Sequence, residues 1–267
     1  MGEHGGSGAA TREDRPRHTG GTGGAGRSIR PASAAGIGPA PVEGGGFGAA
    51  SVAAERPAPA SGIGPARFVF GALTVAVVAM ALLHLFGIGR LDPATTTVSD
   101  YVALPGGATL LALAVLGVAA ATAGVTAAQL AAGAPRRLAV PFGIGCVGLV
   151  ATIAFPTNVI GTATTANAVL HRYAAGLFFV SLPIAAFLSL RHHPSRTVTA
   201  LTTLSVLVGL TFLASHVPLV LPDWPGAHQI GAVLPRGIAE RALLTVDIAL
   251  LAALAGSATR APRKAAR

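Results

Sequence analysis

Apolar residues fill six long stretches of the chain, and short polar stretches separate them. Each stretch has about the twenty residues that a helix needs to cross the hydrocarbon core of a bilayer. Lipid offers no partner for an unpaired backbone group, so these stretches must be helices or the strands of a closed barrel. Barrel strands are shorter and alternate in polarity, which these stretches do not. The pattern predicts an all-α integral membrane bundle of six transmembrane helices, at residues 68–89, 107–132, 138–155, 166–190, 198–221 and 236–258.

The first quarter of the chain has a different composition. Gly, Ala, Pro and Arg dominate residues 1–66, and large apolar side chains are scarce there. Such a segment cannot bury enough surface to offset the entropy lost on ordering, so we predict a disordered cytoplasmic tail. It has no apolar core of a signal peptide near Met1, and the first helix is expected to be an uncleaved anchor. The predicted six-helix transmembrane domain is 67–258, and 259–267 form a short basic cytoplasmic tail.

The composition supports a lipid environment. The chain is 52% hydrophobic and 11% charged, whereas a soluble domain has about 25% charged residues. The net charge of +9 is explained by topology, because most Lys and Arg fall in loops on one predicted side, which the positive-inside rule makes cytoplasmic. We therefore predict a multi-pass protein of the cell membrane with both termini cytoplasmic, membrane lipid as its surroundings, and no nucleic-acid partner. The basic residues on that side are Arg67, Arg136, Arg137, Arg191, Arg196, Arg260, Arg263, Lys264 and Arg267.

A polar segment, residues 91–104, interrupts the apolar pattern in the first predicted outer loop. Asp92 followed by Pro predicts the start of a short interfacial helix, with Asp as N-cap and Pro at the first helical position. Ser99 and Asp100 are either a cap or turn pair or candidate catalytic residues. A nucleophilic Ser needs a base within reach, and His84 or His171 are the candidates for that role.

Ionisable side chains at membrane depth are costly and tend to mark functional sites. Here they cluster near the predicted outer ends of the helices and in the outer loops. This distribution predicts an outward-facing polar pocket. Its candidate residues are His84, Asp92, Tyr101, Asn158, His171, Arg172, His216, Glu240 and Arg241.

Two interpretations of these residues stay open. His84, His171 and His216 lie at similar predicted depth and would suit a Zn²⁺ site, although no two of them share an HxxxH spacing; alternatively, each imidazole bonds a loop carbonyl or water. The sequence requires no cofactor. Arg172 is expected to pair with Glu240 or with Asp247, two carboxylates seven residues apart on one inward helix face; the alternative is a proton or substrate pathway.

Three segments carry a resemblance to a known family. LHLFGIGRLDPATTTVSDYVAL, residues 83–104, resembles the first hairpin of the uncharacterised bacterial membrane family known as domain of unknown function 998. In that family the first helix ends in His, and D-P and S-[DE] follow in the loop. AFPTN at 154–158 is similar to the family's FPTD-type loop, His171 also matches, and GIAERALL at 237–244 is similar to its G-x-x-x-R entry into the sixth helix.

The resemblance covers roughly residues 67–258 and implies a six-helix integral membrane fold without an assigned activity. Asn158 stands where the family pattern has Asp, so no catalytic carboxylate is expected there, although Asn can cap a turn or bond a ligand. The expected function is that of a membrane protein that binds a lipid or small molecule in the outward-facing pocket. The alternatives are a metal-dependent membrane hydrolase and a small transporter. Ligand, oligomeric state and catalytic status are not decided by the sequence.

Overall fold

The structure is a computed structural model that describes residues 64–158, 161–221 and 223–265. The predicted disordered tail therefore lies almost wholly outside the described residues. Within them, six helices are long and apolar enough to cross a membrane, as the hydrophobic pattern predicts. The helices are α1 (Pro65–Gly87), η1 (Val98–Ala103), α2 (Gly107–Ala131), η2 (Arg136–Leu138), α3 (Ala139–Ala154), α4 (Ala166–Leu190), α5 (Arg196–Ala214), α6 (Val217–Val220), α7 (Ala227–Val233) and α8 (Arg236–Ala265).

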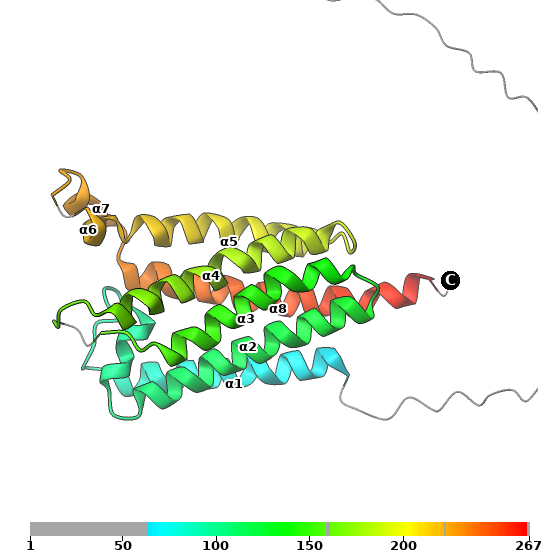
Figure 1. Ribbon diagram of the computed structural model, residues 1–267, viewed down its shortest axis with the longest axis horizontal. Helices are drawn as coiled ribbons and strands as arrows, with labels where there is room; N and C mark the ends of the chain where they lie inside the picture. Colours follow the sequence, from blue (N-terminus) through cyan, green and yellow to red (C-terminus); the bar gives the residue numbers. More distant parts are fainter. Residues whose placement is uncertain (1–63, 159–160, 222, 266–267) are drawn as a thin grey trace, which may run out of the picture. The chain divides into compact units, whose positions relative to one another are not determined.

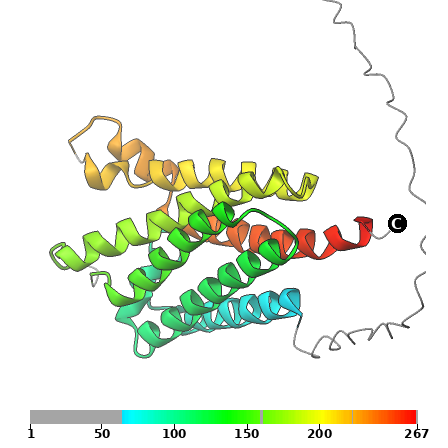
Figure 2. The same cartoon turned by 45° about the vertical axis from the view of Figure 1, so that its right-hand side comes forward.

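The six long helices run up and down, and neighbours in sequence are antiparallel (Figure 1). As a result, α1 begins and α8 ends at the same end of the bundle, which we call the terminal end. The opposite end, which we call the loop end, carries three longer connections, at 88–106, 155–165 and 215–235 (Figures 1 and 2). The predicted pocket residues belong to these connections or to the helix turns beside them.

Helix α8 is the central element of the bundle. It packs against α1, α2, α4 and α5, and η1 packs against it as well. Its inward face holds four leucines that are fully buried, Leu243, Leu250, Leu251 and Leu254. Side chains on the inward face of α8 therefore meet almost every other part of the bundle.

Small residues let the remaining helices approach closely. A Cβ placed on Gly117 of α2 would lie 2.8 Å from the Ala72 carbonyl oxygen of α1, and one on Gly148 of α3 would lie 2.5 Å from the Ala174 carbonyl oxygen of α4. In lipid, where burial of apolar surface does not drive association, such contacts supply the packing energy.

The fifth predicted span is interrupted. Helix α5 ends at Ala214, and the single turn α6 begins at Val217 with Pro218 in its first positions. Proline lacks the N–H that would continue an α-helix, so the helix is interrupted between Ala214 and Val217. The short helices α6 and α7 then lie beyond the end of α5 (Figure 1).

Candidate functional site

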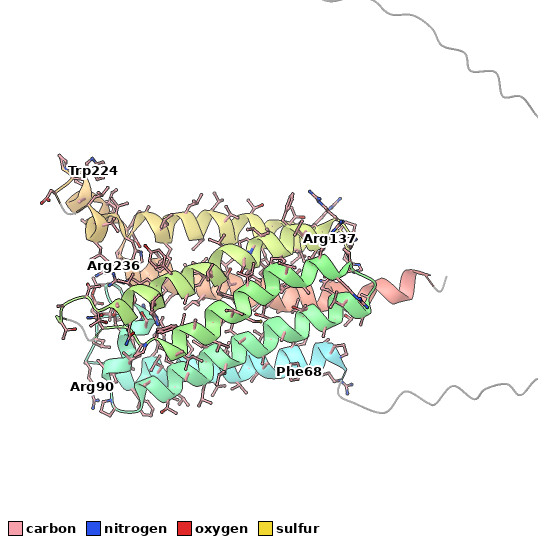
Figure 3. All side chains as sticks on the ribbon, viewed as in Figure 1. Phe68, Arg90, Arg137, Trp224 and Arg236 are labelled. Atoms are coloured by element: carbon pink, nitrogen blue, oxygen red, sulfur yellow. The ribbon has the colours of Figure 1, made fainter. Side chains whose placement is uncertain are left out.

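The polar residues singled out in the sequence gather at the loop end of the bundle. His84 is in the last turn of α1, His171 and Arg172 are in the first turns of α4, and Glu240 and Arg241 are in the first turns of α8. Figure 3 shows Arg90, Trp224 and Arg236 at this end and Phe68 and Arg137 at the other. These side chains therefore lie at the same end of the bundle, as expected. They form three separate groups there and not one pocket.

The first group is centred on Arg241, whose guanidinium donates four hydrogen bonds. Its Nε donates to His84 Nε2 at 2.7 Å, and its Nη2 donates to the Tyr101 hydroxyl at 3.1 Å. Its Nη1 donates to two backbone carbonyls, Thr96 O and Gly237 O, each at 2.8 Å. We call these five residues the Arg241 hub. The hub joins α1, α8 and the 88–106 connection, so it closes this end of the bundle.

The partners of His84 fix its protonation form. Its Nδ1 lies 2.8 Å from the Met80 carbonyl oxygen, which only accepts, so Nδ1 carries the hydrogen. Its Nε2 faces the Nε–H of Arg241, which only donates, so Nε2 presents a lone pair. His84 is therefore neutral in this arrangement. The Tyr101 ring stacks 5.2 Å from the imidazole and 5.5 Å from the guanidinium carbon, where it adds a cation–π contact.

Glu240, the residue before Arg241, holds the same connection by a second contact. Its Oε2 accepts a hydrogen bond of 2.5 Å from the Val98 N–H at the start of η1. The expected pair between Glu240 and Arg172 does not form, because Arg172 is exposed while Glu240 is buried against the 88–106 connection. The N–H groups in the first turn of a helix have no partner within the helix. The Val98 N–H is such a group, and it binds Glu240 where the sequence predicted Arg172.

Replacing Glu240 with Ala is expected to reduce the free energy of unfolding by about 2 kcal/mol, because the buried Val98 N–H loses its acceptor. Glu240→Gln keeps an acceptor oxygen and should lose about half as much. Thermal melting of the purified protein in detergent measures both. Equal losses for the two variants would show that the lost charge, and not the hydrogen bond, is responsible.

The helix in the 88–106 connection begins later than predicted. Asp92 caps only a single turn: its Oδ1 accepts from the Ala94 N–H and its Oδ2 from the Thr95 hydroxyl, and these bonds lower its pKa below the usual value. The helix itself, η1, is capped by Thr97, and Asp100 completes a capping box with it. Pro93 thus follows a turn residue and not a helix N-cap.

Ser99 and Asp100 therefore have local structural partners. Asp100 Oδ2 accepts from the Thr97 N–H at 2.8 Å and from the Thr97 hydroxyl at 2.6 Å, and the Ser99 hydroxyl lies 3.0 Å from the Thr97 hydroxyl. Among the described residues neither His84 nor His171 hydrogen-bonds Ser99. The arrangement is that of a cap and turn pair, the structural alternative left open by the sequence.

The second group braces the connection between α3 and α4. His171 Nδ1 lies 3.0 Å from Thr152 O and 2.9 Å from Phe155 O, at the end of α3. Asn158 Oδ1 accepts from the N–H and the hydroxyl of Thr165, the N-cap of α4, each at 3.1 Å. Its Nδ2 donates to the Ala163 carbonyl. The amide of Asn158 thus uses both its donor and its acceptor, as a carboxylate at this position could not.

The third group contains two arginines and a histidine, which come from α4, from α8 and from the end of α5. His216 follows the last turns of α5, and its Nδ1 lies 3.0 Å from Phe212 O, which leaves Nε2 without a protein partner in the described structure. Arg172 and Arg236 both interact electrostatically with His216. Arg172 is exposed and Arg236 half-buried. We call these three residues the cationic cluster; Arg236 was not among the residues predicted for the pocket.

The three imidazoles do not converge. His84 belongs to the Arg241 hub, His171 to the α3–α4 connection and His216 to the cationic cluster. In the described part of the chain, no group of three or more His, Cys, Asp or Glu side chains is placed to hold a metal ion. Similar depth in the membrane does not bring side chains together when their helices face different neighbours.

Two shallow grooves lie on the lipid-facing side of α1, away from these polar groups. One, of about 300 Å³, is bounded by α1 and α8, and the other, of about 250 Å³, by α1 and α2. Thr74 and Val78 line both, and the other lining residues are apolar. Their lining and their position within the spans suit lipid acyl chains rather than a polar ligand.

A further buried polar contact lies deep in the bundle. Asp247 of α8 accepts a 2.7 Å hydrogen bond from the Ser205 hydroxyl of α5, and Gln129 of α2 approaches the Leu254 carbonyl at 3.4 Å. The expected pairing of Asp247 with Arg172 is absent from the described residues. The sequence analysis did not single out Ser205 and Gln129. Their only signal in the sequence is that each is a polar residue within an otherwise apolar span.

Comparison with known proteins agrees with this architecture. The family model described as "Protein of unknown function (DUF998)" matches residues 69–257, which include all six spanning helices apart from the first turn of α1 and the last residues of the span in α8. No match to a curated protein or to a solved structure was found. The match covers more than half of the chain and coincides with the segments that carry the resemblance in the sequence. The chain therefore belongs to the DUF998 family of proteins of unknown function.

Proposed function

We propose that the protein binds a phosphate-type anion, either a lipid headgroup or a free small molecule, at the loop end of its bundle. The observation that carries this proposal is the cationic cluster. Arg172 and Arg236 both act electrostatically on His216, and none of the three forms an ion pair with a carboxylate among the described residues. An anion bridging the two guanidinium groups would relieve the repulsion between them.

The contrast with Arg241 makes the proposal specific. Arg241 directs four of its five N–H donors at protein acceptors, so it serves the fold. Arg172 has no protein acceptor in the described structure. The carboxylate with which Arg236 interacts electrostatically is that of Glu240, whose Oε2 already accepts from Val98. Guanidinium groups bind phosphate oxygens in a bidentate manner, so these two side chains are the available ligands.

The surroundings favour a lipid as the carrier of the anion. Tyr173, next to Arg172, is exposed, as is Trp224 in the neighbouring connection. Tyr and Trp are enriched at the boundary between headgroups and acyl chains. Cationic side chains at that level attract anionic headgroups by about 1 kcal/mol each.

The test compares two charge-matched double variants of the full chain in detergent. Arg172→Gln with Arg236→Gln is expected to weaken binding of phosphatidylglycerol, measured by native mass spectrometry, by about 30-fold, which corresponds to about 2 kcal/mol. Arg136→Gln with Arg137→Gln, two exposed arginines at the terminal end, is expected to stay close to the unaltered protein. Equal weakening in both variants would reject the site.

Further arms identify the source of the anion. Phosphatidylcholine should bind weakly to all forms, because its headgroup has no net charge. Titration with inorganic phosphate then distinguishes a free anion from a headgroup: competition with phosphatidylglycerol indicates that the phosphate group alone is recognised, and a lack of competition indicates a membrane lipid.

The small transporter is a second candidate, favoured by one observation. A transporter needs polar groups that continue into the membrane beyond the loop end. Asp247 and Gln129 are buried polar residues of this kind, and both lie deeper in the bundle than the Arg241 hub.

A further inference from the structure

Asp247 is the deepest acidic side chain of the described bundle. It is 1% exposed, as is its partner Ser205. Along α8 it lies ~16 Å from Arg236 and ~18 Å from Thr259, the two ends of the membrane span. A carboxyl group is thus held half-way across the hydrocarbon core.

Only one of its two oxygens has a partner. Oδ1 accepts from the Ser205 hydroxyl, whereas Oδ2 is buried and has no hydrogen-bond partner within the described structure. The neighbouring residues one turn away on α8, Leu243 and Leu250, are fully buried and apolar. An ionised carboxylate with an unpaired oxygen in such surroundings is strongly disfavoured unless a positive charge accompanies it.

No side chain that the structure describes supplies that charge. Of the described residues, none of the basic groups on α8 or on the helices packed against it hydrogen-bonds or pairs with Asp247. Those on the other helices lie in the first or last turns of their helices, far from the middle of the span. Where the side chains are described, the titratable and charged groups on α8 and on the elements packed against it are Arg67, His84, Asp100, Tyr101, His171, Arg172, Tyr173, Arg196, Arg236, Glu240 and Arg241.

We propose that Asp247 and Ser205 form a proton-binding site in the interior of the bundle, with the proton carried on Asp247 Oδ2 and Oδ1 held by the Ser205 hydroxyl. The small number of oxygen ligands selects the proton over a metal ion. Hard cations require about six oxygens around them, and this site offers one carboxyl and one hydroxyl. A proton needs only the single unpaired oxygen that the structure provides.

The site belongs to a line of polar groups along one face of α8. Glu240, Asp247 and the Leu254 carbonyl follow one another at intervals of seven residues, or ~10 Å along the helix. Gln129 donates to the last of them, and its Oε1 is also buried without a partner in the described part of the chain. The proton site is therefore the middle of three polar positions that cross the bundle. This proposal does not depend on anion binding at the loop end.

Labelling with dicyclohexylcarbodiimide tests the proposal on the unaltered protein in liposomes. The O–H of a protonated carboxyl adds across one C=N bond of this apolar reagent: the carboxyl oxygen bonds to the central carbon and the proton moves to nitrogen. Migration of the acyl group from oxygen to nitrogen then gives a stable N-acylurea, with a mass gain of one reagent molecule. An ionised carboxylate lacks the proton that this addition needs.

Tryptic peptides separate the relevant carboxyls. Cleavage after Arg241 and Arg260 releases residues 242–260, in which Asp247 is the one acidic side chain, while Glu240 stays on the preceding peptide. At pH 7 we expect one adduct, on Asp247, that is insensitive to added NaCl and is not formed by a water-soluble carbodiimide. The proposal is overturned if Asp247 stays unlabelled, or if Na⁺ protects it, which would identify an alkali cation as the occupant.

Discussion

Arg241→Met is expected to lower the free energy of unfolding by about 3 kcal/mol or more, the largest effect of any single side-chain truncation in this bundle. Met has nearly the length of Arg but no donor, so the substitution leaves four acceptors of the Arg241 hub without their hydrogen bonds. Hydrogen bonds from a charged donor contribute roughly 1.5–3 kcal/mol each, and relief from burying the guanidinium offsets part of their sum.

The one cysteine of the chain provides the measurement. Cys146 is half-buried in α3, with its Sγ 3.6 Å from the Ala119 carbonyl oxygen of α2, so a thiol-reactive dye reports unfolding of the bundle. The apparent melting temperature of Arg241→Met should fall by roughly 6–12 °C. The control is Arg90→Met, which removes an exposed arginine from the same end of the bundle and should alter stability by no more than about 0.5 kcal/mol.

Tyr101→Phe separates the parts of the hub. This change removes one hydroxyl but keeps the ring that packs on His84 and over the guanidinium, so it should cost about 1 kcal/mol. A melting temperature of Arg241→Met equal to that of Tyr101→Phe would mean that the other three hydrogen bonds contribute nothing, and the hub as described would be wrong.

Gly237→Ala is expected to lower the free energy of unfolding by about 3 kcal/mol, although it adds only one methyl group. A Cβ on Gly237 would lie 2.4 Å from Pro93 O, 2.5 Å from Thr96 O and 2.7 Å from Ala94 O. All three are backbone atoms, which cannot move without shifting the whole connection, so the cost is at the upper end for overpacking. The displaced Thr96 carbonyl is also an acceptor of Arg241, so the substitution disturbs the hub as well.

Gly176→Ala on α4 is the matched control. The space beside Gly176 is open, because no atom of a neighbouring helix lies within 4 Å of the position that a Cβ would take. Ala also favours a helix over Gly by about 1 kcal/mol. This variant should therefore melt at or above the temperature of the unaltered protein. Dye labelling of Cys146 measures both variants, and a neutral Gly237→Ala would contradict the close contact between α8 and the 88–106 connection.

These two predictions explain the G-x-x-x-R pattern at the start of the sixth span. A spacing of four places Gly237 and Arg241 on the same face of α8. Gly237 allows the backbone of the connection to lie against that face, and Arg241 then reaches its carbonyl oxygens and the end of α1. The sequence shows the spacing, but only the tertiary contacts show what each residue does.

The predicted pocket illustrates where sequence reasoning reaches its limit. Hydropathy places His84, His171 and His216 at one end of the bundle, because each lies near the same end of a predicted span. It does not say which way an imidazole faces. His84 turns toward α8 and His171 toward the end of α3, while His216 bonds its own helix, since each side chain takes the nearest hydrogen-bond partner that its rotation about the helix axis allows.

The same limit applies to ion pairs. Glu240 and Asp247 were expected to face inward, and both are buried, because residues seven apart share a helix face. Their partners were not expected: a backbone N–H for Glu240 and the Ser205 hydroxyl for Asp247. Opposite charges in a sequence predict a salt bridge. In the folded bundle, the partner of a buried carboxyl group is whichever donor of the neighbouring segment lies opposite it, charged or not.

The sequence by itself determined the membrane bundle, the number of its spanning helices and the end at which its polar residues collect, because the thickness of a bilayer and the cost of burying charge depend only on composition along the chain. Tertiary structure alone decided that Arg241 donates to four protein acceptors, that Arg172 and Arg236 form no ion pair with a carboxylate among the described residues, and that one oxygen of Asp247 is left unpaired. Those outcomes depend on how each helix is rotated against its neighbours, which is set by contacts between segments far apart in the chain.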